Sequence, residues 1–296
     1  MAGVRPFRFS VNMFDVDNPK AWQEKSRRAE ELGYDVLQIP DHLGRPAPFA
    51  ALAAAAAATE RIGLGTFVLN AAFFNPALLA REVSTIDQLS DGRFEFGIGA
   101  GYARNEFEDA GLPWNGAGAR VDYLEATVAD VYRRLADPAH KPAAVQEKVP
   151  LLIAGSGDRM LRLGAEHASI IGFTGSRPIT KVRDTSGLLG PEGFAERVEF
   201  VRAQAGARAD EIELNVLVHL FRITDDREAA AEEIRAELGL NLSVEDMLDV
   251  PTILIGTPEQ MAEHLTAQRA KLGISYYSVM EPNLEPFAKV IAAARG

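Results

Sequence analysis

Residues 87–101 read DQLSDGRFEFGIGAG and contain a complete helix–turn–strand–turn unit of an α/β fold. The apolar end of a helix gives way to Asp91-Gly92, a dipeptide typical of tight turns. Apolar residues then alternate with polar residues or glycines over Arg93–Gly99, which predicts a strand whose apolar side chains face the helices. The glycine turn Gly99-Ala100-Gly101 follows at the C-terminal end of this strand.

The same alternation of helix, turn and strand recurs along the chain. Strands are expected to begin near Phe7, Asp35, Ile62, Arg93, Leu151, Ser169, Ile212 and Ile274. The seventh strand is expected to cover Ile212–Ile223. Pro46 is expected in the first turn of the helix after the second strand, and Asn75 and Thr257 are expected as helix N-caps. Strands separated by single helices pair in parallel through right-handed crossovers. Eight such units predict a (β/α)8 TIM barrel that covers residues 1–296 as one domain, with loop insertions at its C-terminal face. The alternative is an open doubly wound sheet, but residues 12–18 contain no glycine and therefore no dinucleotide fingerprint.

Composition excludes several classes of function. The formal net charge of -11 argues against a broad nucleic-acid or anionic-membrane surface. The chain has no cysteine, which rules out disulfides, thiolate zinc sites and cysteine nucleophiles. We identify neither a signal peptide nor an apolar run long enough for a membrane span, and we expect a cytoplasmic protein. The histidines do not follow a zinc-binding spacing, so no metal site is expected; they are His42, His140, His167, His219 and His264.

Candidate binding residues lie where the predicted strands end, because barrels of this kind bind ligands at the C-terminal ends of their strands. This rule selects Asn12, Asp41, His42, Asn70, Ala71, the run Gly99-Ala100-Gly101-Tyr102 and the run Ala154-Gly155-Ser156-Gly157. The last run precedes a helix whose free amides favour an anion. Glycines on the inner face of the fourth strand leave room for a flat ligand. Tight strand-to-helix turning is the structural alternative for both glycine runs.

His42 has two interpretations. It is either a hydrogen-bonded structural histidine or a proton donor or acceptor, since histidines titrate near neutrality. Its position at a strand C-terminus raises the second role to equal weight with the first, and the residues alone leave both open. Glu95, deep in its strand, is interpreted as part of a buried polar network that stabilises the barrel.

Seven motifs in this order resemble the luciferase-like monooxygenase superfamily. They are Glu30-x-Leu32-Gly33-Tyr34-Asp35, Pro40-Asp41-His42, Thr59-Glu60-Arg61-Ile62-x-Leu64-Gly65-Thr66, Asn75-Pro76-Ala77-x-x-Ala80-Arg81-Glu82, Asp87-x-Leu89-Ser90-Asp91-Gly92-Arg93-Phe94, Gly97-Ile98-Gly99-Ala100-Gly101 and Ile255-Gly256-Thr257-Pro258-Glu259-Gln260. The pattern is most similar to the branch described as coenzyme F420-dependent. Other members of the superfamily use FMN.

The resemblance implies a flat three-ring cofactor in the barrel mouth. It places His42 near the reactive face of the ring, as the catalytic residue. It implies that Asn70 and Asn105 contact the ring or its side chain, and that Ala154–Gly157 receive the phosphate-bearing tail. It also implies a non-prolyl cis peptide at Phe67-Val68, forming a bulge behind the ring.

The sequence departs from the sugar-phosphate dehydrogenases of this branch at two positions. They carry a tryptophan where this chain has Pro46, and a glutamate where it has Tyr102. We therefore do not expect one of those dehydrogenases. The role of proton donor then falls to His42, or alternatively to Tyr102 or Glu106.

The expected activity is hydride transfer between F420 and a small organic substrate. The alternatives are an FMN-dependent monooxygenase with a flavin reductase partner and a catalytically silent flavin-binding protein; a homodimer is also left open. F420 has a longer anionic tail than FMN, and Arg177, Lys181 and Arg183 supply cations in the loop after the sixth strand. Solvated loop charges are the alternative interpretation of these three residues.

Overall fold

The computed structural model of the chain describes residues 5–175 and 187–296. Its main strands are β1 (Arg8–Asn12), β2 (Val36–Ile39), β3 (Gly63–Thr66), β4 (Leu69–Asn70), β5 (Phe94–Gly99), β6 (Leu151–Gly155), β7 (Ile170–Phe173), β8 (Glu213–Leu217) and β11 (Ile274–Met280). They follow the order β3-β2-β1-β11-β8-β7-β6-β5-β4, and β3 also pairs with β5, which closes the sheet. The predicted (β/α)8 barrel is confirmed, and its strands begin within about two residues of the expected positions.

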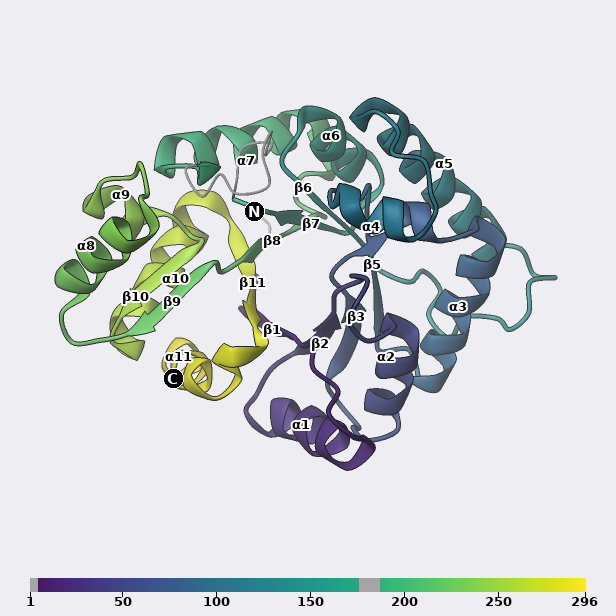
Figure 1. Cartoon of the computed structure of the whole chain (residues 1–296), viewed down its shortest axis with the longest axis horizontal. Coiled ribbons are helices and arrows are strands. Elements are labelled where there is room, and N and C mark those ends of the chain that lie inside the picture. The colour runs from purple at the N-terminus through teal and green to yellow at the C-terminus, as the bar shows by residue number, and fades with distance from the viewer. Residues whose placement is uncertain (1–4, 176–186) are drawn as a thin grey trace. The chain divides into compact units, whose positions relative to one another are not determined.

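Helices connect the strands (Figure 1). They are α1 (Pro19–Glu31), α2 (Pro48–Ala56), α3 (Pro76–Leu89), α4 (Arg104–Asp109), α5 (Ala117–Leu135), α6 (Asp158–His167), α7 (Pro191–Ala205), α8 (Arg227–Leu238), α9 (Val244–Asp249), α10 (Pro258–Leu272) and α11 (Leu284–Arg295). Within the described part of the chain, none of them combines the length and the apolarity that crossing a membrane requires.

Local start signals account for several helix boundaries. The Asn75 side chain accepts hydrogen bonds from the first-turn amides of α3, and Thr257 forms a capping box with Gln260 at the start of α10. We expected Pro46 in the first turn of α2, which was wrong. Pro48 occupies that turn, and Ala47 before it is extended because a residue preceding proline is disfavoured in the α conformation.

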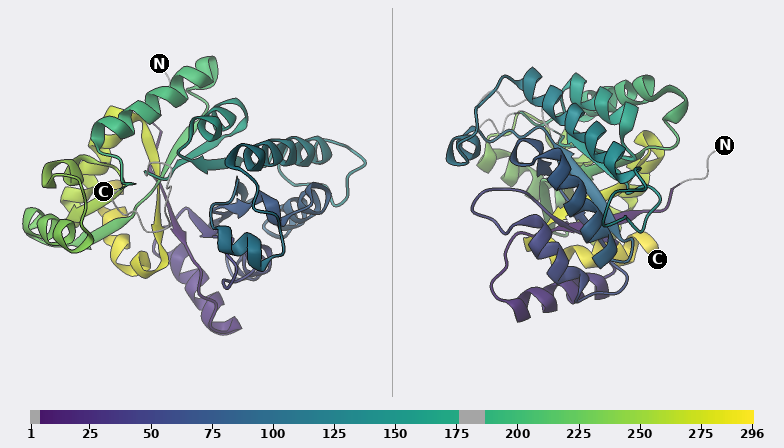
Figure 2. Two further views of the ribbon diagram at one scale, coloured as in Figure 1. Left: turned by 45° about the horizontal axis from the view of Figure 1, so that its top comes forward. Right: turned by 90° about the vertical axis from the view of Figure 1, so that its right-hand side faces the viewer.

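The chain divides into two compact units. The N-terminal unit comprises Asn12–Glu31 and Asp35–Ala154; the C-terminal unit comprises the described parts of residues 1–11, 32–34 and 155–296. In the N-terminal unit, α5 lies along α3 in both views of Figure 2.

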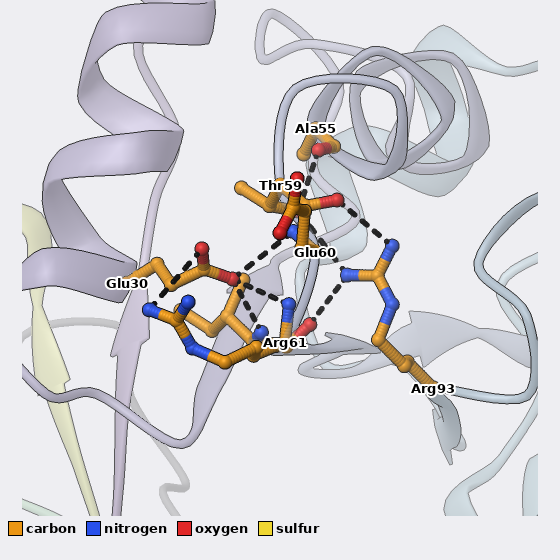
Figure 3. A network of polar contacts seen from close by, with 7 residues as sticks. Glu30, Ala55, Thr59, Glu60, Arg61 and Arg93 are labelled. Carbon is orange, nitrogen blue, oxygen red and sulfur yellow. Dashed lines mark hydrogen bonds and ion pairs between the residues drawn. The ribbon is translucent and has the colours of Figure 1, made fainter.

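Arg93 organises the polar interior of the N-terminal unit (Figure 3). Its Nε donates to the Ser90 carbonyl at 2.7 Å, and Nη1 donates to the Ile62 carbonyl at 2.7 Å. The same guanidinium also donates to Thr59 Oγ1 and to the Thr59 and Ala56 carbonyls. One planar cation thus connects the end of α2, the start of β3 and the turn before β5, satisfying carbonyls that would otherwise be buried without partners.

Glu30 also holds the segment before β3, through the backbone amides of that segment. Its Oε2 accepts the backbone amides of Glu60, Arg61 and Ile62 at 3.2, 2.6 and 2.8 Å. Burial opposes ionisation of this carboxyl, but the three amides and the Arg61 charge outweigh it and lower the pKa of Glu30. The motif residues around positions 30, 59–62 and 93 therefore form a scaffold.

Asp87 performs a similar task at the end of α3. Its fully buried carboxylate accepts the Val145 amide at 2.7 Å, and the Gln146 amide and side chain at 3.0 and 2.7 Å. The connection between α5 and β6 is thereby held against α3. The turn that follows is left-handed at Asp91 and Gly92, with φ of 53° and 75°, as the Asp-Gly dipeptide predicted.

The C-terminal unit shows the predicted alternation of faces. Phe9 packs edge-on against Phe287 of α11 at 5.7 Å between ring centroids. The neighbouring Ser10 points to the opposite face, where its hydroxyl lies 2.7 Å from the Ser278 hydroxyl, which also accepts from the Asn215 amide at 2.9 Å. Polar side chains therefore line the inner side of these strands, as expected.

One strand prediction was wrong. We expected a single strand over Ile212–Ile223, but it is broken after Leu217 and resumes as β9 (Leu220–Ile223), which pairs in parallel with β10 (Ile253–Gly256). Val218 still donates its amide to Ser278, whereas His219 donates to Thr252. The chain leaves one strand partner for another at this point, and apolar periodicity does not reveal such a change.

We predict that Arg93→Lys lowers the free energy of unfolding by about 2–3 kcal/mol, because one ammonium cannot reach the acceptors that the guanidinium fork serves. Urea unfolding followed by circular dichroism provides the measurement. Arg133→Lys is the control, since that side chain is 63% exposed and pairs only with Asp130 on its own helix. We expect the control to change stability by less than about 0.5 kcal/mol; equal effects of the two variants would contradict the role of Arg93.

Candidate functional site

Polar side chains converge beyond the C-terminal ends of β2, β4 and β5 in the N-terminal unit. Asp41, two residues after β2, accepts the Asn70 amide on Oδ2 at 3.0 Å. Asn70 ends β4 and is in register with Gly99 at the end of β5. The parallel arrangement therefore brings the ends of three strands to one place, as the site rule predicted.

His42 makes the shortest side-chain contact of this cluster. Its Nδ1 lies 2.7 Å from Oε1 of Glu106, which is in α4. The two side chains are 34% and 12% exposed, so the carboxylate is mostly buried while one edge of the imidazole is accessible. The His42 carbonyl accepts the Arg45 amide at 3.0 Å, which closes the turn after β2.

Tyr102 lies on the solvent side of His42. Its hydroxyl is 3.5 Å from His42 Nε2, and the two rings meet edge-on at 5.7 Å between centroids. The side chain is nevertheless 74% exposed. The imidazole thus has Glu106 at one nitrogen and a loosely held phenol at the other.

The turn after β5 requires glycine at position 101. Gly101 has φ of +72°, and a Cβ there would lie 2.5 Å from Oδ1 of Asn70. That same oxygen accepts the Ala72 amide at 3.2 Å. The close approach of Gly101 to Asn70 thereby positions the segment that carries Tyr102 and Glu106.

The Phe67-Val68 peptide is cis, as predicted. Thr66 braces this bulge against β5: its hydroxyl donates to the Gly97 carbonyl at 2.7 Å and accepts the Gly97 amide at 2.9 Å. A Cβ at Gly97 would lie 1.9 Å from the Thr66 carbonyl oxygen, and one at Gly99 would lie 2.9 Å from Val68. These two glycines therefore make room for the bulge, and the expectation that they leave that space to a ligand was wrong.

The electrostatics of the cluster favour neutral groups. Burial raises the pKa of Asp41 to about 6, against the lowering effects of the Asn70 amide and of His42; the Glu106 charge raises it further. Desolvation of the hydroxyl and the same Glu106 charge raise the pKa of Tyr102. Groups with such perturbed titration are enriched at functional sites.

The remaining predicted residues have different surroundings. Asn12 is buried at the end of β1, and Asn105 is exposed on α4 while its neighbour Glu106 turns inward. Ala100 and Ala154 are partly buried. Arg177 and Lys181, like Arg183, lie outside the described residues. Across residues 5–175 and 187–296, no cluster of His, Asp and Glu is arranged to hold a metal ion.

The predicted phosphate turn continues into the C-terminal unit. Gly155 packs closely on Met160, since a Cβ there would lie 2.9 Å from Met160 Cβ. Gly157 is the N-cap of α6, no side chain caps that helix, and a Cβ at position 157 would meet nothing within 4 Å. The first amides of α6 therefore border open space, which is the setting that suits an anion.

Glu106 was predicted as an alternative proton donor, but its contact with His42 was not predicted. Thr66 and the helix α4 were not predicted either. The only available signal was that Glu106 follows the glycine turn closely enough to fold back over a neighbouring strand end. For Thr66 the sequence held no signal, because its partner Gly97 is distant in the chain.

The luciferase-like monooxygenase family model matches residues 9–243, and the chain belongs to this family. The family predicted from the sequence is therefore confirmed. The relatives include enzymes named as F420-dependent, in agreement with the predicted branch and with the predicted enzyme class.

Three relatives illustrate the range of the matches. The chain is 29% identical over 266 residues to an F420-dependent glucose-6-phosphate dehydrogenase of Beutenbergia cavernae, covering 81% of this chain and 75% of that one. It is 26% identical over 262 residues to an FMNH2-dependent dimethylsulfone monooxygenase of Pseudomonas putida, covering 72% and 68%. A shorter match, 42% identical over 107 residues, spans 32% of the F420-dependent glucose-6-phosphate dehydrogenase of Intrasporangium calvum and 32% of this chain.

Solved structures confirm the fold. An F420-dependent secondary alcohol dehydrogenase in complex with an F420-acetone adduct superposes with a TM-score of 0.75 at 17% identity, covering 99% of this chain and 100% of that one. A coenzyme F420-dependent tetrahydromethanopterin reductase from Methanopyrus kandleri has a TM-score of 0.73 at 18% identity, covering 97% and 99%.

We predict that Asp41→Asn gains stability relative to the unchanged protein as pH rises from about 4 to about 7. A folded carboxyl with a pKa of about 6 resists ionisation, so it destabilises the fold once the unfolded chain ionises near its ordinary value. Asparagine retains the acceptor for the Asn70 amide and removes this penalty. Urea unfolding at several pH values measures the difference; a difference independent of pH would contradict the raised pKa.

Proposed function

We propose that this protein is an F420-dependent oxidoreductase that moves a hydride between the deazaflavin and a small organic substrate. The observation that carries the proposal is the cluster of Asp41, His42, Asn70 and Tyr102 at the C-terminal strand ends, in a family with F420-dependent members. We further propose that residues 1–296 act as one catalytic domain.

His42 is the proposed catalytic residue. When bound, the deazaflavin supplies a hydride acceptor or donor, and His42 supplies the matching proton site. Its accessible edge carries Nε2, which can accept a proton from a substrate hydroxyl or return one to a carbonyl oxygen. Glu106 lies 2.7 Å from Nδ1 and holds the imidazole in place while Nε2 exchanges the proton.

Each unit carries residues that suit one part of the proposed cofactor, either the ring or its phosphate-bearing tail. Asn70 and Asp41 provide hydrogen-bonding groups beside the Phe67-Val68 bulge. The uncapped start of α6, with open space at Gly157, suits a phosphate. Asn12, Gly99, Ala100, Gly101, Asn105, Ala154, Gly155 and Ser156 complete the proposed cofactor-binding set, and Arg177 with Lys181 are proposed for the anionic tail.

An FMN-dependent monooxygenase is the second candidate. The specific observation that favours it is the long match to the FMNH2-dependent enzyme of Pseudomonas putida. Pro46 and Tyr102 also stand where the sugar-phosphate dehydrogenases of the branch carry other residues. Since both cofactors share a three-ring system and a phosphate, binding experiments have to separate them.

We predict that the apoprotein binds F420 more tightly than FMN, and that the difference shrinks as salt rises because part of it comes from the tail carboxylates. Fluorescence titration at low and moderate salt measures both affinities. Stoichiometric FMN binding without measurable F420 affinity would make the FMN-dependent monooxygenase the better proposal. Binding of either cofactor without any turnover would favour a silent flavin-binding protein.

A matched pair of variants tests the phosphate turn in the same titration. Gly157→Ala adds a methyl group in open space and should leave affinity unchanged. Gly157→Asp should cap α6 with its own carboxylate, which stabilises the helix but occupies the amides and repels the phosphate. We expect the aspartate variant to lose at least about tenfold in affinity, or about 1.4 kcal/mol. Equal binding by both variants would exclude this turn as the phosphate site.

We predict that His42→Ala folds normally and slows turnover by about 10²–10⁴-fold, the usual range for a general acid or base. The absorbance of F420 follows the reaction with the substrate in either direction. His167→Ala is the control, because that histidine is half-exposed on α6. Unchanged turnover in His42→Ala would make His42 a structural residue.

A further inference from the structure

The hydrogen bond between His42 and Glu106 indicates which tautomer the imidazole adopts, a point that the proposed function leaves open. Oε1 of Glu106 lies 2.7 Å from Nδ1 of His42. An ionised carboxylate only accepts hydrogen bonds. Nδ1 must therefore carry a hydrogen in this contact, and in the neutral imidazole the lone pair is then on Nε2.

Glu106 is held in place by its own helix. The adjacent residue Phe107 is buried, with ring centroids 6.0 Å from Phe73 and 4.9 Å from Trp114. Arg120 lies over the Trp114 ring at 3.8 Å and covers the cluster. This aromatic packing fixes α4, so the carboxylate meets the imidazole without rearrangement, as a positioning group requires.

Tyr102 is compatible with the same assignment at the other nitrogen. Its hydroxyl, which can donate or accept, lies 3.5 Å from Nε2 and donates to it when Nε2 carries a lone pair. The contact is long and the residue is 74% exposed, so a substrate hydroxyl can replace the phenol without disturbing buried structure. The contact of Nδ1 with Glu106 therefore decides the tautomer, and the contact with Tyr102 fits it.

We propose that Glu106 is a positioning residue that holds His42 in the Nδ1–H tautomer, so that Nε2 exchanges the proton of the reaction and Tyr102 occupies this nitrogen until substrate displaces it. The part concerning proton exchange rests on the proposed function; the tautomer does not. In the oxidative direction the substrate hydroxyl proton passes to Nε2 as the substrate carbon loses hydride to the deazaflavin and its C=O bond forms. The reverse reaction returns the proton from the same atom.

The purely structural alternative is that Glu106 merely connects α4 to the turn after β2. Both roles predict lower stability when the contact is lost. Only the positioning role predicts a change in the protonation of the imidazole nitrogens in a folded protein, so this is the quantity to measure.

The first experiment uses apoprotein labelled with ¹⁵N-histidine, and compares the unchanged protein with Glu106→Gln and Glu106→Ala. NMR on the alkaline limb of the titration reports which imidazole nitrogen carries the hydrogen. We expect the Nδ1–H pattern for His42 in the unchanged protein and a shift toward Nε2–H in both variants. Glu106→Gln has the same shape, so it distinguishes loss of the carboxylate from loss of packing.

Glu108→Gln is the matched control. Glu108 is on the same helix, 58% exposed, and pairs with Arg104 at 2.8 Å. It should leave the His42 pattern unchanged. An Nε2–H pattern in the unchanged protein, or identical patterns in Glu106→Ala and the unchanged protein, would overturn the proposal.

The second experiment measures carbethoxylation of His42 by diethyl pyrocarbonate, followed by mass spectrometry of the His42 peptide. The reagent attacks a nitrogen lone pair, so Tyr102→Phe should accelerate the reaction several-fold by uncovering Nε2. Glu106→Ala should slow attack at Nε2, because the hydrogen can then move from Nδ1 to Nε2. Unchanged rates in both variants would contradict the assignment of Nε2.

F420 titration of the same variants separates the two proposals. Unchanged F420 affinity in Glu106→Gln with a shifted His42 pattern supports both. Absence of F420 binding in the unchanged protein overturns the proposed function while the NMR result still decides the tautomer. Normal F420 binding with an unshifted pattern overturns the positioning role alone.

Discussion

A guanidinium enclosed by backbone carbonyls is the constraint on which the N-terminal unit depends. Arg93 donates to carbonyls from the end of α2, from the start of β3 and from the turn before β5, and Glu30 binds the amides of the same pre-β3 segment. Buried carbonyls and amides need partners, so these two side chains fix where β3 and β5 begin. The strand ends that carry Asp41, Asn70 and the glycine turn are positioned as a consequence, one strand length away.

The sequence predicted the elements whose signals are local. The Asp91-Gly92 turn, the Asn75 and Thr257 caps and the strand over residues 93–99 all follow from neighbouring residues. The break after Leu217 could not be predicted in this way, because it arises from a change of hydrogen-bond partner from Ser278 to Thr252, far away in the chain. The prediction that Pro46 lies in the first turn of α2 was wrong because Pro48 disfavours the α conformation at Ala47, the residue before it.

The same distinction between predictable and unpredictable features applies to the functional site. Strand ends predicted Asp41, His42 and Asn70 as neighbours, since topology alone brings parallel strand ends together. The partner of His42 depends on α4, a helix of six residues whose apolar pattern is too short to recognise. Gly97 and Gly99 of β5 were expected to leave room beside them because they lack side chains. The Thr66 carbonyl and Val68 occupy that room.

Tyr102 lies at the boundary between the scaffold and the solvent, and this position has a consequence for protein engineering. Its side chain is 74% exposed and makes one long hydrogen bond, so few substitutions there disturb packing. Gly101 before it and Glu106 after it are, by contrast, fixed by close contacts. A library that varies position 102 alone would therefore change the surface beside His42 at nearly constant stability, with the neighbouring segment unchanged.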